Sequence, residues 1–234
     1  MTHSQLFDSW PDRYDGWFET PLGKLIRHVE SEIVIDLLQP GRGETILDAG
    51  CGTAIFTVDI LATGARVVGL DISYPMLRQT ESKVGCYPFD PIQGDILSLP
   101  FSDGTFDRTV SVTALEFIAN ARRAVDELFR VTRPGGIVVV ATLNSKSSWA
   151  TERKQEAQEN RVSLFSRAIF RSPAELAALG HAPAYVTTAI HFHRGAALEQ
   201  ARNAELEGRR KGLDTGAFVA CSWTKPRPLG AIHA

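Results

Sequence analysis

Cysteine is scarce in this sequence, and the three residues present (Cys51, Cys86 and Cys221) are too far apart to share a metal ion. An odd and widely scattered set of this kind is typical of reduced thiols rather than of a disulfide scaffold. Long apolar runs are missing as well, since no window approaches the roughly 18 uncharged residues of a transmembrane helix. The N-terminus carries acids instead of the apolar core of a signal peptide, so we expect a cytoplasmic protein.

A strong charge of either sign is also absent. Lys and Arg together number 25 and Asp and Glu 27, which gives a formal net charge of −2. This balance provides no electrostatic footprint for nucleic acid or for an anionic membrane. At 234 residues the chain is long enough for one sizeable α/β domain, and two full domains would be crowded.

The stretch Ile46–Ala54 joins an apolar run, an acid and two glycines, and residues 55–61 behind it are typical of a helix. Glycines at a junction between a buried strand and a helix allow a tight turn and let backbone N–H groups approach a ligand. This is the nucleotide-binding position of a doubly wound α/β sheet. The dinucleotide fingerprint needs Gly or Ala at position 55, where this sequence has Ile. An NAD-dependent oxidoreductase is therefore disfavoured, and we keep it as an alternative.

A second acid, Asp71, ends the apolar run Arg66–Asp71 about 20 residues after Gly52. At this offset a carboxylate can accept hydrogen bonds from both hydroxyls of a ribose. The alternative interpretation is that Asp71 caps a helix that opens at Ser73. Asp71 is thus a candidate for binding a nucleoside.

These residues, together with later stretches, resemble the class I S-adenosylmethionine (SAM) dependent methyltransferases, in the type 11 group that acts on small molecules. Motif I of that family, an acid followed by Gly-x-Gly-x-Gly, is matched at Asp48–Gly52, with Ala54 at the third glycine position. Gly94–Phe101 resembles the family's Gly-Asp-x-x-x-Leu-Pro-Phe stretch, and Arg133–Gly136 resembles its Lys-Pro-Gly-Gly turn. The resemblance covers residues 10–145, with its motifs in the family's order.

The resemblance implies a single methyltransferase domain over residues 1–234, built on a Rossmann-like doubly wound α/β sheet. Seven strands would lie in the order 3-2-1-4-5-7-6, with strand 7 antiparallel. Residues 1–40, an aromatic cluster followed by an amphipathic helix, are expected to form an N-terminal helical lid, although the aromatic residues could equally be packing anchors. Residues 144–171 leave the fifth strand where such sheets bind ligands, so we expect a cap over the substrate.

The implied cofactor is SAM, with S-adenosylhomocysteine (SAH) as its product. In the family, the acid after the second strand binds the ribose, and the acid of the Gly-Asp stretch binds the adenine amine. No metal is expected. The residues expected around the cofactor are Tyr14, Asp48, Gly50, Cys51, Gly52, Thr53, Asp71, Ile72, Met76, Asp95, Ile96 and Thr113.

The candidate catalytic residues are Tyr14, Glu116 and His191. SAM carries its own leaving group, so the protein supplies mainly proximity and orientation. A general base is needed only where the acceptor must first lose a proton. Glu116 could instead be an acid that a helix dipole favours. Residues Tyr185–His193 are expected to form the sixth strand, which would place His191 and His193 on one face.

The acceptor is expected to be a small molecule, and no nucleic-acid or membrane partner is expected. The motifs Asn-Pro-Pro-Tyr and Asp-Pro-Pro-Tyr of nucleic-acid methyltransferases are absent after the fourth strand, where Thr113–Glu116 stands. A module that binds SAM or SAH without turning it over remains a second alternative. The methylated atom and the oligomeric state are not specified by the sequence.

Overall fold

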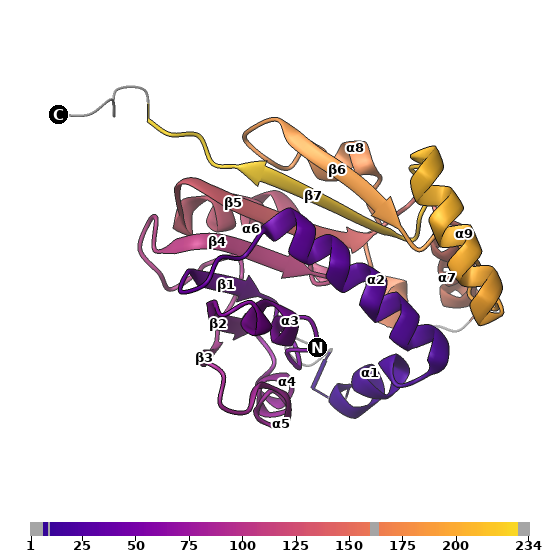
Figure 1. Ribbon diagram of the computed structural model, residues 1–234, viewed down its shortest axis with the longest axis horizontal. Coiled ribbons are helices and arrows are strands. Elements are labelled where there is room, and N and C mark those ends of the chain that lie inside the picture. Colours follow the sequence, from indigo (N-terminus) through magenta and orange to yellow (C-terminus); the bar gives the residue numbers. More distant parts are fainter. Residues whose placement is uncertain (1–6, 9, 160–163, 229–234) are drawn as a thin grey trace.

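A seven-stranded sheet with helices on both faces forms the protein, as the computed structural model in Figure 1 shows. The structure describes residues 7–8, 10–159 and 164–228. The strands lie in the order β3-β2-β1-β4-β5-β7-β6, and β7 runs antiparallel to both of its neighbours. The predicted fold class and strand order are therefore confirmed. The strands are β1 (Thr45–Ala49), β2 (Arg66–Asp71), β3 (Phe89–Gln93), β4 (Phe106–Val112), β5 (Thr132–Leu143), β6 (Ala184–Ala189) and β7 (Phe218–Thr224).

The helices begin and end at local sequence signals. Helix α2 starts after Thr20, whose hydroxyl accepts a hydrogen bond from the Gly23 N–H, and α8 starts with a complete capping box between Ser172 and Glu175. The helices are α1 (Pro11–Phe18), α2 (Pro21–Leu38), α3 (Thr57–Ala62), α4 (Tyr74–Arg78), α5 (Glu81–Val84), α6 (Ala121–Val131), α7 (Ser148–Glu159), α8 (Pro173–Ala177) and α9 (Leu198–Lys211), with short 3-10 helices η2 (Leu115–Phe117) and η3 (Leu164–Arg167).

The sheet is buried on both faces, and neighbouring residues of β1 point to opposite cores. Ile46 belongs to the core under α2 and α3, whereas Leu47 belongs to the core under α6 and α8. Both side chains are fully buried, as expected for the central strand of a parallel sheet with helices on either side. The nearly continuous apolar run of β1 follows from this double burial.

The predicted sixth strand, Tyr185–His193, extends further toward the C-terminus than the observed one. β6 ends at Ala189, and Ile190 turns the chain with a φ of 64°. The carbonyl of Ile190 accepts a hydrogen bond from the Ala217 N–H (3.0 Å), which holds this turn against the start of β7. His191 and His193 therefore do not share a strand face, and that prediction is wrong.

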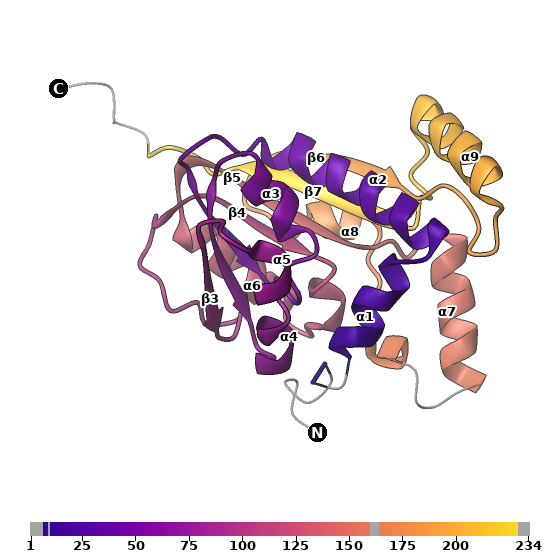
Figure 2. The same ribbon diagram turned by 60° about the horizontal axis from the view of Figure 1, so that its bottom comes forward.

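Helices α1 and α7 lie at the same end of the molecule, beyond the carboxyl ends of β4 and β5 (Figures 1 and 2). They belong to the two segments expected to form a lid and a cap, of which residues 1–6, 9 and 160–163 lie outside the described residues. Helix α7 (Ser148–Glu159) lies within residues 144–171, the expected cap. Both segments are thus placed at the edge of the sheet where ligands bind in this fold.

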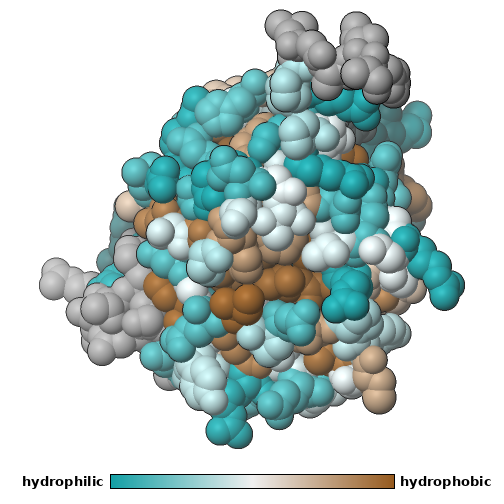
Figure 3. Space-filling view, turned by 90° about the vertical axis from the view of Figure 1, so that its left-hand side faces the viewer, coloured by the Kyte–Doolittle hydropathy of each residue, from teal (hydrophilic) through white to brown (hydrophobic). Residues whose placement is uncertain are grey.

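The surface is mixed in hydropathy. On the side that lies at the left of Figure 1, hydrophobic side chains gather in the middle of a hydrophilic surround (Figure 3). Within the part of the chain that the structure describes, no helix combines the length and the apolar character needed to cross a bilayer.

Candidate active site

A cavity of about 240 Å³ opens where the carboxyl ends of β1, β2 and β4 meet. This volume is just below the roughly 300–1,000 Å³ of typical small-molecule pockets. All but one of the residues expected around the cofactor line this cavity. The lining includes Tyr14, Asp48, Gly50, Cys51, Gly52, Asp71, Ile72, Met76, Asp95, Ile96 and Thr113.

The glycine turn after β1 forms the floor of this cavity. Gly50 has a φ of +81°, and a Cβ at this position would lie 2.5 Å from the Ala114 Cβ, so a larger residue does not fit. Gly52 also has a positive φ (+54°), but a Cβ there would meet no atom within 4 Å. The backbone at Gly52 therefore faces open space, where a ligand can approach closely.

Three aspartates, Asp48, Asp71 and Asp95, line the cavity. The Asp71 carboxylate accepts hydrogen bonds from the N–H groups of Gly52 and Ser73, both at 2.8 Å. Burial raises the pKa of Asp48 to about 7, although its carboxylate accepts a hydrogen bond from the Thr57 hydroxyl (2.6 Å). Among the described residues that line the cavity there is no Lys or Arg. The site therefore suits a neutral or cationic ligand, since these residues offer no positively charged side chain to an anionic one.

The N-terminal segment closes over one side of the cavity. Asp15 at α1 accepts hydrogen bonds from the Thr53 hydroxyl and from the Lys83 ammonium, both at 2.6 Å. Phe7 packs edge to face on Phe117, with ring centroids 4.9 Å apart, and both rings line the cavity. Thr53 itself does not line the cavity, because it lies behind the turn, where its hydroxyl donates to Asp15.

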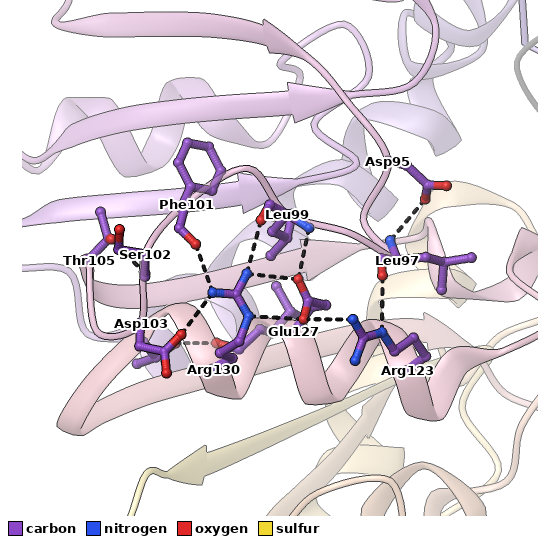
Figure 4. A network of polar contacts seen from close by, with 12 residues as sticks. Asp95, Leu97, Leu99, Phe101, Ser102, Asp103, Thr105, Arg123, Glu127 and Arg130 are labelled. Atoms are coloured by element: carbon purple, nitrogen blue, oxygen red, sulfur yellow. Dashed lines mark hydrogen bonds and ion pairs between the residues drawn. The ribbon is translucent and has the colours of Figure 1, made fainter.

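The loop Gly94–Phe101, which lines another wall, is attached to α6 by charged side chains (Figure 4). Arg123 and Arg130 donate to backbone carbonyls of this loop over 2.7–3.1 Å. The Glu127 carboxylate accepts from the Leu99 N–H (2.8 Å), and the Arg130 guanidinium holds the pKa of Glu127 below its usual range. Helix α6 thus fixes the loop that carries Asp95 without reaching the cavity itself.

Two of the candidate catalytic residues lie at or beside the cavity. Tyr14 lines it, with its hydroxyl 3.5 Å from the Thr113 hydroxyl, and burial raises the pKa of this phenol. Glu116 is buried behind the lining residues and accepts a hydrogen bond from the Thr142 hydroxyl (2.9 Å). Burial raises the pKa of Glu116 to about 7, which suits proton transfer near neutral pH.

The third candidate, His191, lies elsewhere. Its ring packs against Gly208 of α9, and its Nε2 lies 3.2 Å from the Thr188 carbonyl oxygen. It does not belong to the cavity lining, because the chain turns away from β6 at Ile190. Within the described residues, no group of three or more His, Cys, Asp or Glu side chains gathers as a metal site would require.

Several lining residues were not predicted from the sequence. Phe7 comes from the N-terminal segment and Phe117 from η2, and Leu97 follows the Asp95 turn. For Phe7, the available sequence signal was the aromatic cluster within the first 20 residues, since aromatic side chains often line ligand pockets.

Known proteins resemble this chain in both sequence and structure. Residues 47–140 match the family model of the methyltransferase domain. The demethylmenaquinone methyltransferase of Mycobacterium marinum is 30% identical over 197 residues, which cover 82% of this chain and 80% of that protein. The malonyl-[acyl-carrier protein] O-methyltransferase of Erwinia pyrifoliae is 39% identical over 118 residues, 50% of this chain and 44% of that protein.

A solved SAM-dependent methyltransferase from Thermotoga maritima shares the fold, with a TM-score of 0.75 at 22% identity over 95% of this chain and 99% of that one. The fold and site thus define a class I α/β methyltransferase. The chain belongs to the SAM-dependent methyltransferase family, as the motifs predicted. It spans about half the length of the malonyl-[acyl-carrier protein] O-methyltransferases that it matches.

Proposed function

We propose that this protein is a SAM-dependent methyltransferase that transfers a methyl group to a small-molecule acceptor. The observation that carries this proposal is the cavity at the glycine turn, where three aspartates converge without a basic residue. A sulfonium and an adenosine offer a positive charge and several hydrogen-bond donors, which such a wall can accept. An NAD-dependent oxidoreductase is disfavoured by Ile55, which stands where the dinucleotide fingerprint needs Gly or Ala.

The cofactor residues take the following roles in this proposal. Asp71, which ends β2, accepts hydrogen bonds from the ribose hydroxyls, and Asp95 accepts one from the adenine amine. Ile72 and Met76 pack on the adenine ring from the start of α4. The turn at Gly50 and Gly52, with Asp48, Cys51, Ile96 and Thr113 around it, holds the methionine part.

The chemistry needs little from the protein beyond placement. Bound SAM supplies an activated methyl group, and the transfer is an in-line displacement. Tyr14, held over the cavity by α1, orients the reacting centre and excludes water, and a ring near a cation is favourable by roughly 0.5–2 kcal/mol. Residues 1–40 act as a lid and residues 144–171 as a cap, because α1 and α7 both lie beyond the carboxyl ends of β4 and β5 (Figure 2).

Relatives act on unlike acceptors, as the names demethylmenaquinone methyltransferase and malonyl-[acyl-carrier protein] O-methyltransferase state. This difference supports no particular acceptor for this chain. A small molecule is favoured over nucleic acid because the net charge of −2 provides no attraction for phosphates.

Calorimetric titration of SAH tests the proposal. Wild-type protein is expected to bind SAH in the micromolar range, and Asp71→Ala to weaken binding by roughly 1.5–3 kcal/mol. Asp90→Ala, an exposed acid on the neighbouring strand β3, is the matched control and is expected to leave the affinity unchanged. No SAH binding by the wild type, or binding of NADH instead, would overturn the assignment. SAH binding without methyl transfer to any acceptor would favour the non-catalytic module.

A further inference from the structure

Three ionisable side chains from three different segments meet beside Tyr14. Glu30 on α2 and Glu116 on η2 are buried, and Arg153 on α7 is largely covered. Burial raises the pKa of both carboxyl groups, and the positive charge of Arg153 opposes this rise in each, so Arg153 lies within electrostatic reach of both. Yet within the described part of the chain, no ion pair of 4.0 Å or less joins Arg153 to either carboxylate.

The guanidinium of Arg153 is held by aromatic rings rather than by hydrogen-bond acceptors. Its Cζ lies 4.1 Å from the ring centroid of Phe165 and 5.5 Å from that of Trp149. Its Nε is buried and has no hydrogen-bond partner among the described residues. Burial, followed by repulsion from Arg194, lowers the pKa of Arg153 to about 10, so the group stays charged at neutral pH. A buried N–H donor without an acceptor is costly, and a ligand can supply the missing acceptor.

A row of aromatic rings connects this guanidinium to the cofactor cavity. Phe117 lines the cavity, and its ring centroid lies 6.4 Å from that of Phe165. The Arg153 guanidinium in turn lies over the Phe165 ring. Tyr14 also lines the cavity, and burial raises the pKa of its phenol, with the nearby charges of Glu30 and Glu116 adding to this rise. A molecule that reaches the methyl group could therefore also contact Arg153.

Resting on the proposed methyltransferase function, we infer that Glu30, Glu116 and Arg153 form the acceptor subsite and that the acceptor carries a carboxylate. The Arg153 guanidinium binds this carboxylate through its Nε–H, which has no partner among the described residues, since a planar guanidinium suits a carboxylate. The rings of Phe117 and Phe165 cover the apolar body of the acceptor. A single negative charge matches the single charge of Arg153.

Glu116 receives the proton in this arrangement. A lone pair of the acceptor's hydroxyl oxygen or amine nitrogen forms the bond to the methyl carbon. The carbon–sulfur bond breaks, and its electron pair remains on sulfur, which leaves neutral SAH. The proton that the hydroxyl or amine loses passes to the Glu116 carboxylate, so charge and atoms balance. Glu30, on α2, does not contact the acceptor and acts on the subsite through the charges of Arg153 and Glu116.

Binding of a simple carboxylate to the SAH-loaded protein tests the inference. The probe is benzoate, the neutral isostere is benzamide, and the readout is the Nε–H resonance of Arg153 in protein labelled with ¹⁵N-arginine. We expect a saturable shift of this resonance with benzoate and none with benzamide. Arg153→Gln is expected to weaken benzoate binding at least about tenfold. Arg194→Gln is the matched control, because Arg194 also lies over the Trp149 ring but pairs with Glu156 at the surface.

Failure of this inference can be told from failure of the proposed function. If the wild type binds SAH but shows no saturable shift with benzoate, the carboxylate subsite is wrong and the methyltransferase proposal stands. Tighter binding of benzylamine or of phenyl phosphate than of benzoate would also overturn it. Calorimetry with SAH is run on each variant, and an unchanged affinity shows that the cofactor site of Arg153→Gln is intact. The wild-type titration is decisive even where a variant fails to fold.

Discussion

The backbone N–H of Gly52 donates a hydrogen bond to the Asp71 carboxylate over 2.8 Å, which ties the glycine turn after β1 to the end of β2. The other oxygen of Asp71 accepts from the Ser73 N–H at the start of α4. Asp71 therefore links the glycine turn to the start of α4 through its two carboxylate oxygens. Both interpretations of this acid from the sequence, nucleoside binding and support of the following helix, are compatible with this geometry.

The first prediction follows from these two hydrogen bonds. Asp71→Asn leaves one backbone N–H without an acceptor, so we expect the free energy of unfolding without ligand to fall by about 1–3 kcal/mol. Urea denaturation of the ligand-free protein measures this change. Asp90→Asn on β3, which is exposed, is expected to stay within about 0.5 kcal/mol of the wild type. An unchanged stability for Asp71→Asn would show that the turn does not depend on this acid.

A second prediction concerns Ala54, which replaces the third glycine of the family motif. Ala54 has a φ of 64°, where an L-residue costs roughly 1–2 kcal/mol. Replacement by Gly relieves this strain but removes a buried methyl group that contributes about 0.8 kcal/mol. We expect Ala54→Gly to raise the free energy of unfolding by up to about 1 kcal/mol in urea denaturation.

Gly50→Ala serves as the opposing variant in the same experiment. A Cβ at this position would lie 2.5 Å from the Ala114 Cβ, and its φ is +81°. Strain and overpacking together are expected to lower the free energy of unfolding by at least about 2 kcal/mol. A marked loss of stability in Ala54→Gly would mean that the methyl packing outweighs the strain.

The motifs predicted the strand order because, in the family, each motif occurs next to one particular strand of the sheet. The acid and glycines of Asp48–Gly52 can only follow a first strand, and Asp71 ends the next one. Arg133–Gly136, expected as the turn before the fifth strand, lies within β5, which pairs parallel with β4. Local sequence thus specifies where the polar groups leave the sheet, and parallel strands bring their carboxyl ends to one edge.

Features set by distant parts of the chain were not predicted. The alternation of Tyr185–His193 is typical of a strand throughout, but Ile190 takes a left-handed φ as it bonds to Ala217 of the following segment. Likewise, Arg153 and Glu30 are polar residues on helices, which periodicity alone places toward solvent. Their burial depends on how α7 and α2 pack at the edge of the sheet, and no local pattern encodes that contact.

A third prediction tests whether α6 supports the cofactor wall from behind. Arg130→Ala removes the donors to the carbonyls of Leu99 and Phe101, so the loop that carries Asp95 loses part of its attachment to α6 (Figure 4). We expect SAH to bind roughly 3–30-fold more weakly, since a loosened wall must be ordered on binding. Calorimetry measures the affinity. Arg122→Ala on the same helix, which donates to Ala178 instead, is expected to bind SAH as the wild type does.

The outcome that would contradict this prediction is a loss of stability in Arg130→Ala with unchanged SAH affinity. The network around Glu127 would then support the fold without influencing the cavity. Glu127→Gln offers an independent check, because its amide can neither pair with Arg130 as an ion nor accept as strongly from the Leu99 N–H.

The fourth prediction is a stability that falls as the pH rises, and it rests on Glu30. Burial raises the pKa of Glu30 to about 8, with the charges of Glu116 and Glu205 adding to this, against about 4.3 in the unfolded chain. The folded state therefore holds a proton that the unfolded state releases between these values. The resulting stability is fully present below about pH 4 and is lost as the pH rises through about 8.

Glu30→Gln is neutral at every pH, so the substitution is expected to remove much of this slope. At pH 9 we expect it to raise the free energy of unfolding by roughly 2–4 kcal/mol, while at pH 5 it changes little. Urea denaturation at both pH values measures the difference. Glu32→Gln on the same helix is the matched control, because Glu32 is half exposed and is expected to leave the slope unchanged. A slope as steep in Glu30→Gln as in the wild type would assign it to other buried acids, of which Asp48 and Glu116 are the nearest in pKa.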